Sequence, residues 1–179
     1  MTGSPPLVHY RGDAYRCVPD NGPFEPRGLI DRDGENDRWH RRDEPTVYLA
    51  LDPGVAVAEA GRHLEPTRSR DEKSRRTCHR ILRIAVDAAD LVDLRDRATR
   101  EVVGAGDAPL GFLDRERSRS LAEELRSTTH ARGLIVPSVA FLDDPSRANL
   151  VLFMEDREDE LGEIIGEWRE IGRIDLDTA

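Results

Sequence analysis

Residues 45–64 read PTVYLALDPGVAVAEAGRHL and place a strand directly before a helix. The β-branched, apolar run at 46–51 predicts a short strand. Asp52 then offers an N-cap and Pro53 a first helical position, so we expect a helix from there to the end of the stretch. Glu59 stands among the small apolar residues of this helix, where a packing residue would be expected. A carboxylate in that place needs an explanation from the rest of the chain.

The other expected elements are short. Residues 7–18 predict one or two strands around a Gly-Asp turn, and residues 158–168 predict an amphipathic helix. The stretch 19–43 has no periodicity and is typical of a functional or disordered loop, and the stretch 65–78 predicts a polar loop. Further strands are expected at 80–86, 91–95, 133–138, 149–155 and 169–176, and further helices at 114–130 and at 96–106, the latter ending at Gly104 or Gly106.

This order of elements indicates a fold class. Several short strands mixed with a few helices, without regular βαβ repetition, predict an α+β fold with a mixed or antiparallel sheet core and short helices. The 179 residues suit a single compact domain. We expect a flexible tail at residues 1–6 and the domain at residues 7–179.

The charge balance excludes some classes of partner. The chain has a formal net charge of −9, which argues against binding to nucleic acid or to an anionic membrane surface. Its two cysteines, Cys17 and Cys78, lie far apart and fit free thiols in a reducing compartment. The sequence shows neither a signal peptide nor an apolar run long enough to span a membrane. We therefore expect a cytoplasmic protein.

Familiar catalytic motifs are absent from the sequence. It contains no GxGxxG, Walker A, GxSxG or HExxH pattern. Acidic runs such as EDREDE (155–160) are typical of a solvated surface, so no metal site is expected. The histidines are scattered, and each is expected to be a surface residue and not a ligand: His9, His40, His63, His79 and His130.

Four features in a fixed order resemble a known family. They are a Tyr-Arg pair near the start, DRWH (37–40) before a strand, VYLA followed by Ala and Glu (47–59), and GLIVPS (133–138) followed by NLVLF (149–153). Together they resemble the RES domain, the toxin half of RES–Xre toxin–antitoxin pairs. The resemblance covers roughly residues 7–155.

The resemblance implies a compact α+β fold similar to the core of ADP-ribosylating toxins. It implies degradation of NAD by hydrolysis or phosphorolysis, with NAD as the substrate, no further cofactor, and inorganic phosphate as one of the two candidate acceptors. It also implies neutralisation by a helical Xre-type antitoxin that covers the site. A homodimer inside such a toxin–antitoxin complex is compatible with it.

The resemblance also assigns site residues. Tyr48 and Glu59 match the family pattern. The first arginine is Arg16 or Arg11, since both follow a tyrosine, and the sequence after Arg16 better resembles the family's first strand. The second arginine is Arg38, although the family's Gly-Arg-Trp-Asn reads Asp-Arg-Trp-His here, which leaves the role of the final Asn open.

A serine completes the assignment. Ser138 matches the family's Pro-Ser pair. Some members place the important serine at the start of the preceding helix, where Ser118 or Ser120 is the candidate in this chain. Glu59, Arg16 and Tyr48 are thus the candidate catalytic residues, and Arg38 and Ser138 the candidate substrate-binding residues.

These residue types suit cleavage of the bond between nicotinamide and ribose. Nicotinamide leaves as a neutral molecule, so no strong general acid is required, and positive charge develops on the sugar. A fixed carboxylate such as Glu59 stabilises that charge and orients the attacking water or phosphate. Arg16 and Arg38 offer bidentate donors to the pyrophosphate. Tyr48 is suited to stack on nicotinamide or to donate to the ribose, and Ser138 to hydrogen-bond the ligand.

Other interpretations stay open. Glu59 is also placed to pair with Arg62 or His63 along the helix surface, for about 0.2–0.5 kcal/mol. An ADP-ribosyltransferase that modifies a macromolecule would use the same fold, although the segment around Glu59 lacks the second acid that such enzymes often carry. A non-catalytic family member that serves as a binding partner is a further alternative.

Overall fold

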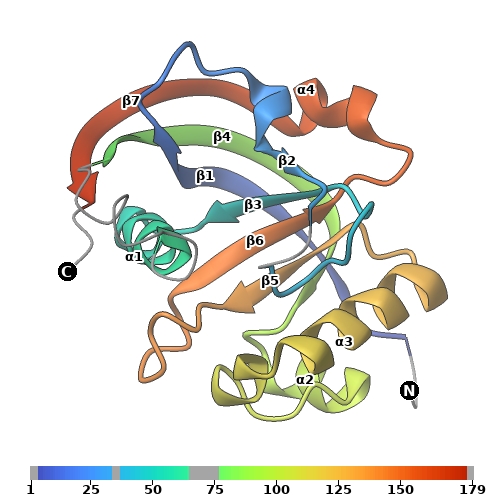
Figure 1. The fold of residues 1–179 in the computed structure, drawn as a ribbon. Helices are drawn as coiled ribbons and strands as arrows, with labels where there is room; N and C mark the ends of the chain where they lie inside the picture. The colour runs from blue at the N-terminus through green and yellow to red at the C-terminus, as the bar shows by residue number, and fades with distance from the viewer. Residues whose placement is uncertain (1–3, 34–36, 65–76, 177–179) are drawn as a thin grey trace.

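A computed structural model describes residues 4–33, 37–64 and 77–176. In this part the chain forms a seven-stranded sheet and four α-helices, which confirms the α+β class with a mixed sheet (Figure 1). The strands are β1 (Leu7–Pro19), β2 (Ile30–Asp31), β3 (Thr46–Ala50), β4 (Thr77–Asp93), β5 (Gly133–Pro137), β6 (Ala148–Phe153) and β7 (Ile165–Leu176). The helices are α1 (Pro53–Leu64), α2 (Arg97–Val103), α3 (Arg115–Thr128) and α4 (Leu161–Ile164), with 3-10 helices η1 (Pro26–Leu29), η2 (Leu110–Leu113) and η3 (Glu158–Glu160).

The strands close into a circuit of hydrogen bonds. β1 pairs with both β3 and β4, and the order β3–β6–β5–β4 leads back to β1. All pairings in this circuit are antiparallel except that of β4 with β5. β7 extends the sheet from β4, and the short β2 pairs with β3. In Figure 1, β1, β4 and β7 curve together over one side, opposite β3, β6 and β5.

Two predicted breaks in strands are wrong. β1 has no turn at its Gly-Asp pair, because Gly12 pairs with Val86 and the register continues to Pro19 opposite His79. The strand predicted at 80–86 and the first three residues of the one predicted at 91–95 are likewise parts of the single 17-residue β4, which ends at Asp93. Asp87 stays in the strand because β1 supplies a pairing partner there, with Arg11 opposite it. Asp90 lies at an irregularity of this pairing and has a positive φ of 59°.

The C-terminal segment also differs from its prediction. Of the helix expected at 158–168, only Leu161–Ile164 is α-helical, and β7 begins at Ile165. The edge of β4 takes this segment as a neighbour, with Trp168 opposite Ile84. Pairing along a long strand therefore overrides a helical apolar pattern of a few residues. The strand expected at 169–176 is confirmed as the second part of β7.

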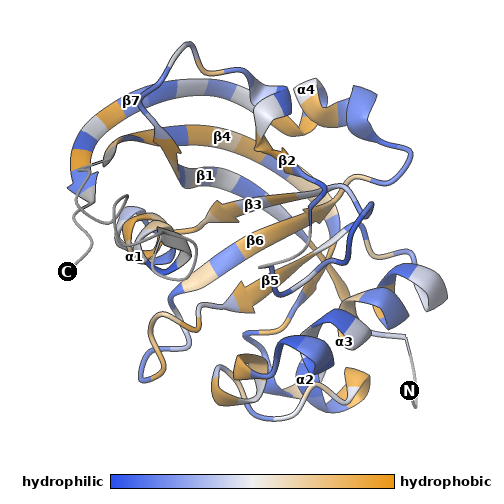
Figure 2. Cartoon of the chain, viewed as in Figure 1, coloured by the Kyte–Doolittle hydropathy of each residue, from blue (hydrophilic) through white to orange (hydrophobic). Residues whose placement is uncertain are grey.

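Alternate residues of β5 and β6 face two different cores. Ile135, Leu150 and Leu152 pack with residues of β1, β4 and α4. Leu134, Val136, Val151 and Phe153 pack instead against α2, α3 and η2. Because both faces of these strands are covered, the strands are apolar along most of their length (Figure 2). By contrast, α3 is mostly hydrophilic.

The helix ends follow local rules of the sequence. Gly104 ends α2 with a φ of 68°, a left-handed conformation that glycine adopts readily. Asp114 caps α3 by accepting a hydrogen bond from the backbone N of Arg117 at 3.1 Å. The helices expected at 96–106 and 114–130 are therefore confirmed. No helix in the described part of the chain is long and apolar enough to cross a membrane.

Three predicted segments fall partly outside the described residues. Of the tail predicted at 1–6, residues 4–6 are described and have no regular secondary structure. Of the loop predicted at 65–78, the residues 65–76 lie outside the description, and Thr77 already belongs to β4. Of the long loop predicted at 19–43, residues 34–36 lie outside the description, and the described part is largely irregular, interrupted by η1 and β2.

Strands β4, β5 and β6 pack closely around Gly133. A Cβ atom at this position would lie 2.9 Å from Leu91 Cδ2 and 3.2 Å from Leu152 Cα, and would also clash with the carbonyl oxygen of Val151. We expect Gly133→Ala to lower the free energy of unfolding by about 2–3 kcal/mol, measured by urea denaturation. Gly162→Ala is the matched control, because nothing lies within 4 Å of its added Cβ. Equal losses in both variants would contradict this packing.

Candidate active site

One cavity of about 630 Å³ gathers most of the predicted site residues. Arg16 of β1, Arg38 of the segment before β3, Tyr48 of β3 and Glu59 of α1 all line it. Ser138, just after β5, contacts Glu59. Residues from distant parts of the sequence are thus brought to one place.

The start of α1 fixes the direction of the helix. Asp52 Oδ1 accepts hydrogen bonds from the backbone N of Gly54 at 2.8 Å and of Val55 at 3.1 Å, as the predicted N-cap requires. Val55 and Ala56 are buried against β1 and β3. Glu59 follows one turn after these two residues, so the packing of small side chains aims its carboxylate toward the cavity.

Two neutral donors hold the Glu59 carboxylate. Ser138 Oγ donates to Glu59 Oε1 at 2.6 Å, and Asn149 Nδ2 donates to the same oxygen at 3.0 Å. Ser138 is fully buried, and its own Oγ accepts from the backbone N of Ala140 at 3.1 Å. Hydrogen bonds to an ionised carboxylate are short and strong, so this pair fixes the orientation of the acid.

The structure does not show the alternative pairing of Glu59 with Arg62 along the helix. Arg62 Nη1 instead donates to the carbonyl of Val139 at 3.0 Å. The side chain of His63 lies outside the described residues. Glu59 is therefore held by β6 and the residue after β5, at the other side of the cavity, and not by Arg62.

Arg16 and Arg11 lie in different environments. Arg16 is half-buried, lines the cavity and donates from Nη1 to the carbonyl of Tyr48 at 3.2 Å. Arg11 is exposed and donates from Nε to Asp87 Oδ2 at 2.8 Å. The geometry therefore favours Arg16 as the arginine of the site.

Arg38 is held by η2. Its Nη1 donates to the carbonyl of Leu113 at 3.0 Å and also to that of Phe112. Burial lowers the pKa of the Arg38 guanidinium, and the positive charges of Arg115 and Arg62 lower it further, while Glu59 opposes the shift. These neighbours show that several cations share the space next to the carboxylate.

The cavity is more positive than the rest of the molecule. Four arginines line it, and three acids oppose them, whereas the whole chain carries a net charge of −9. The arginines are Arg16, Arg38, Arg62 and Arg115, and the acids are Asp31, Asp37 and Glu59. Such an excess in a partly enclosed space favours an anionic ligand.

Tyr48 connects the cavity wall to the segment that carries Arg38. Its Oη accepts a hydrogen bond from the backbone N of Trp39 at 3.1 Å and lies 2.8 Å from His40 Nδ1. Burial, and then the charge of Asp37, raise the pKa of Tyr48 well above its usual value, so the hydroxyl stays neutral. The ring is left to form part of the cavity surface.

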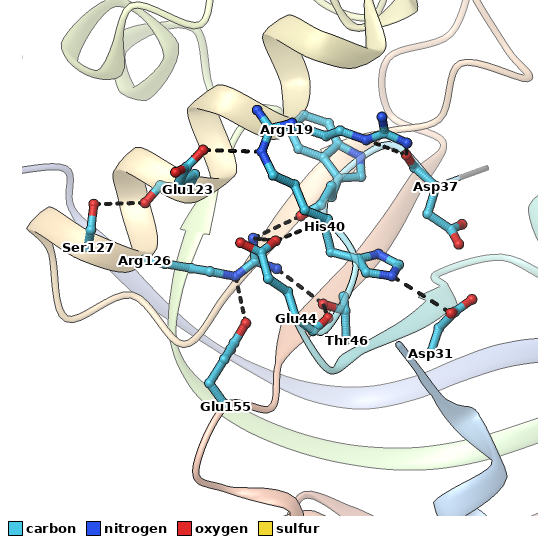
Figure 3. Close-up of polar contacts among 12 residues, drawn as sticks. Asp31, Asp37, His40, Glu44, Thr46, Arg119, Glu123, Arg126, Ser127 and Glu155 are labelled. Carbon is cyan, nitrogen blue, oxygen red and sulfur yellow. Dashed lines mark hydrogen bonds and ion pairs between the residues drawn. The ribbon is translucent and has the colours of Figure 1, made fainter. Parts of the chain in front are cut away.

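Two arginines of α3 hold the same segment from its other side (Figure 3). Arg119 donates from Nη2 to the backbone carbonyl of Asp37 at 2.7 Å. Arg126 donates to the carbonyl of Trp39 at 3.0 Å and to Thr46 Oγ1 at 3.1 Å. Residues 37–46 are therefore fixed to the body of the protein although they lack regular secondary structure before β3.

The expectation that all histidines are surface residues is wrong for two of them. His40 is fully buried and His79 is 5% exposed. His40 packs against the ring of Tyr48 and lies 3.7 Å from Asp31. His79 belongs to β4 and lies in the wall of the cavity. A histidine in an irregular stretch gives no local signal of such enclosure.

The alternative serines lie away from the cavity lining. Ser118 is buried within α3, where its Oγ donates to the carbonyl of Asp114 at 2.9 Å. Ser120 is exposed. The geometry therefore favours Ser138, although as a partner of Glu59 and not as a residue that lines the cavity itself.

Several residues of the site are not found from the sequence. Asn149 is predicted only as the start of a strand, and Arg62, Arg115, Asp31 and Asp37 receive no role. Asn149 carries one usable signal, because it is a polar residue between buried neighbours in an otherwise apolar strand. The arginines carry none, since 26 of the 27 cationic residues of this chain are arginine.

Comparisons with known proteins identify the family and the fold of this chain. The family model of the RES domain matches residues 13–175. The crystal structure of the M. tuberculosis MbcT–MbcA toxin–antitoxin complex contains a chain with a similar fold, at a TM-score of 0.64 and 17% sequence identity, over 96% of this chain and 87% of that one. No match is found among curated proteins. Because the family model covers most of the sequence, this chain belongs to the RES domain family.

Proposed function

We propose that this protein is an NAD-degrading toxin that cleaves the bond between nicotinamide and ribose. The observation that carries the proposal is the Glu59 carboxylate, held by Ser138 and Asn149 beside a cavity lined by four arginines. A carboxylate fixed on one oxygen and a cluster of cations are the two parts that an anionic glycosidic substrate requires.

Glu59 acts on the sugar. As nicotinamide leaves, positive charge develops on the ribose, and a preorganised carboxylate stabilises that charge without having to reorient. Its Oε1 accepts from both Ser138 and Asn149, whereas no described donor bonds Oε2. Oε2 is therefore the oxygen that accepts a hydrogen bond from a ribose hydroxyl or from the attacking acceptor.

The arginines act on the pyrophosphate. Arg38 is already anchored by two carbonyls of η2, so binding a phosphate oxygen with its remaining donors requires little further ordering. Arg16 is anchored in the same way on the carbonyl of Tyr48. Two guanidinium groups that face one cavity neutralise the two charges of a pyrophosphate and leave Glu59 free to face the ribose.

The acceptor is water or inorganic phosphate, since Glu59 orients either of them. The toxin role is supported by membership of the RES family and by the fold shared with a chain of the MbcT–MbcA toxin–antitoxin complex. We extend the proposal to an Xre-type antitoxin that covers the cavity and so excludes NAD. The acids Asp31 and Asp37 line the same cavity, so an ADP-ribosyltransferase acting on a macromolecule is the alternative that the experiment has to separate.

The first experiment measures NAD turnover with and without Glu59. The purified chain is incubated with NAD, with and without inorganic phosphate, and nicotinamide and the ADP-ribose product are quantified by liquid chromatography. We expect release of nicotinamide by the wild type and at least a roughly 100-fold lower rate for Glu59→Gln, because the isosteric amide cannot stabilise positive charge. Glu124→Gln, the same change at an exposed position of α3, is the matched control and should keep the wild-type rate.

Each outcome of this experiment has a meaning. Free ADP-ribose indicates hydrolysis, and a phosphorylated product that appears only with phosphate indicates phosphorolysis. Label transferred from NAD to added protein or nucleic acid would support the transferase alternative. A folded wild type that releases no nicotinamide in either condition, or a Glu59→Gln variant that keeps the full rate, would overturn the proposal.

Ser138 and Asn149 are expected to act by positioning Glu59. Ser138→Ala and Asn149→Ala each remove one hydrogen bond to a charged oxygen, so we expect kcat to fall about 10-fold with little change in KM for NAD. Because both bonds reach Oε1, the losses should not be additive in the double variant. A rise in KM alone would show instead that these residues bind the substrate directly. Ser127→Ala, at an exposed position, is the control.

Arg38 is expected to need its guanidinium and not only its charge. Lysine cannot both bond the two carbonyls of η2 and present a fork to a phosphate. We expect Arg38→Lys to raise KM for NAD about 10-fold or more, measured by steady-state kinetics. Arg97→Lys, at an exposed position of α2, should leave KM unchanged. If Arg38→Lys also leaves KM unchanged, Arg38 does not bind the pyrophosphate.

A further inference from the structure

Three side chains next to the cavity converge although they come from two separate segments. Asp31 ends β2, whereas Asp37 and His40 flank Arg38 and Trp39. One ligand atom from each of the three lies within 4.8 Å of the other two (Figure 3). Asp31 and Asp37 also line the cavity, so the cluster is reached from solvent through it.

His40 gives this cluster an unusual feature. Its side chain is fully buried, and its Nδ1 is engaged with Tyr48 Oη at 2.8 Å. Its Nε2 makes no hydrogen bond and points toward Asp31 Oδ1, 3.7 Å away, which is too long for a hydrogen bond. A buried polar nitrogen without a partner is costly, and a bound ion would satisfy it.

The two acids are held in place by hydrogen bonds. Asp31 Oδ1 accepts a hydrogen bond from the backbone N of Asp33 at 2.9 Å. Asp37 is fixed through its backbone carbonyl, which accepts from Arg119 Nε at 3.0 Å and Nη2 at 2.7 Å. Two carboxylates and an imidazole nitrogen therefore face one point.

We propose that Asp31, Asp37 and His40 bind a divalent transition-metal ion, such as Zn²⁺, through two carboxylate oxygens and His40 Nε2. An imidazole with two carboxylates is a ligand set that Zn²⁺ and Mn²⁺ accept. Three ligands of one tetrahedral ion, each about 2.1 Å from it, lie roughly 3.4 Å apart. His40 Nε2 and Asp31 Oδ1 are already 3.7 Å apart, and all three ligand atoms lie within 4.8 Å of one another.

The other ring nitrogen of His40 already has a partner. A metal-ligating histidine usually donates its other ring N–H to an oxygen, which fixes its tautomer. Here Nδ1 lies 2.8 Å from Tyr48 Oη. In the tautomer in which Nδ1 donates to this oxygen, the lone pair of Nε2 faces the metal site. Asp37 and His40 are also the two positions at which this chain departs from Gly-Arg-Trp-Asn. The ion would tie β2 to the segment that carries Arg38.

The test measures binding of Zn²⁺ and not activity, so it stands or falls independently of the proposed NAD cleavage. The wild-type protein is stripped with a chelator, dialysed and titrated with ZnCl₂ by isothermal titration calorimetry. We expect a stoichiometry near one per chain, and an affinity weaker by about tenfold or more in Asp31→Asn and in Asp37→Asn. Asp33→Asn is the matched control, because its side chain is 77% exposed and lies outside the cluster; its affinity should equal that of the wild type.

The isosteric variants keep His40 in place, and circular dichroism with thermal unfolding checks that each of them is folded. A proton on His40 is the competing occupant, since it would pair with Asp31. In that case Zn²⁺ would not bind at one ion per chain. Alternatively, Zn²⁺ would bind elsewhere, through the cysteines or other histidines, and its affinity for Asp31→Asn and Asp37→Asn would equal that for the wild type. Either result would overturn the metal site.

Discussion

The structure depends on how the two edges of β4 are shared. β1 occupies one edge along almost its whole length, while β7 and then β5 occupy the other. Because β1 also meets β3, this sharing closes the circuit of strands and brings β1, β3 and β6 around one cavity. The bond from Arg16 to the carbonyl of Tyr48 crosses the β1–β3 junction, where the register has one paired position. Arg16 thus lines the cavity where the sheet is least paired.

Local chemistry makes part of the fold predictable. The caps at Asp52, Gly104 and Asp114 act within one turn of helix, so α1, α2 and α3 follow from short windows of sequence. The lengths of β1, β4 and β7 do not follow, because a strand continues wherever a partner strand is present. An Asp-Ala-Ala-Asp interval resembles a break until β1 is known to lie beside it.

The same division applies to the site. Glu59 stands out because an acid among small apolar residues contradicts its own surroundings. Asn149 does not, since its meaning depends on a carboxylate 90 positions earlier. The burial of His40 is missed for the same reason: it is produced by Tyr48 and by the two α3 arginines that hold residues 37–46. The sequence pattern within one helix or strand shows that a residue such as Glu59 is unusual. The partners that give this residue a role lie in other elements, and only the fold brings them beside it.

The order of these partners along the chain has a consequence for synthesis. Glu59 leaves the ribosome first, and Ser138 and Asn149 follow 79 and 90 residues later. At about 5–20 residues per second, translation needs roughly 5–20 s to supply them. During that interval β3 also lacks β6, its neighbour within the circuit. A nascent chain therefore carries Glu59 without the two donors that hold it, and the carboxylate is fixed only after Asn149 has been translated.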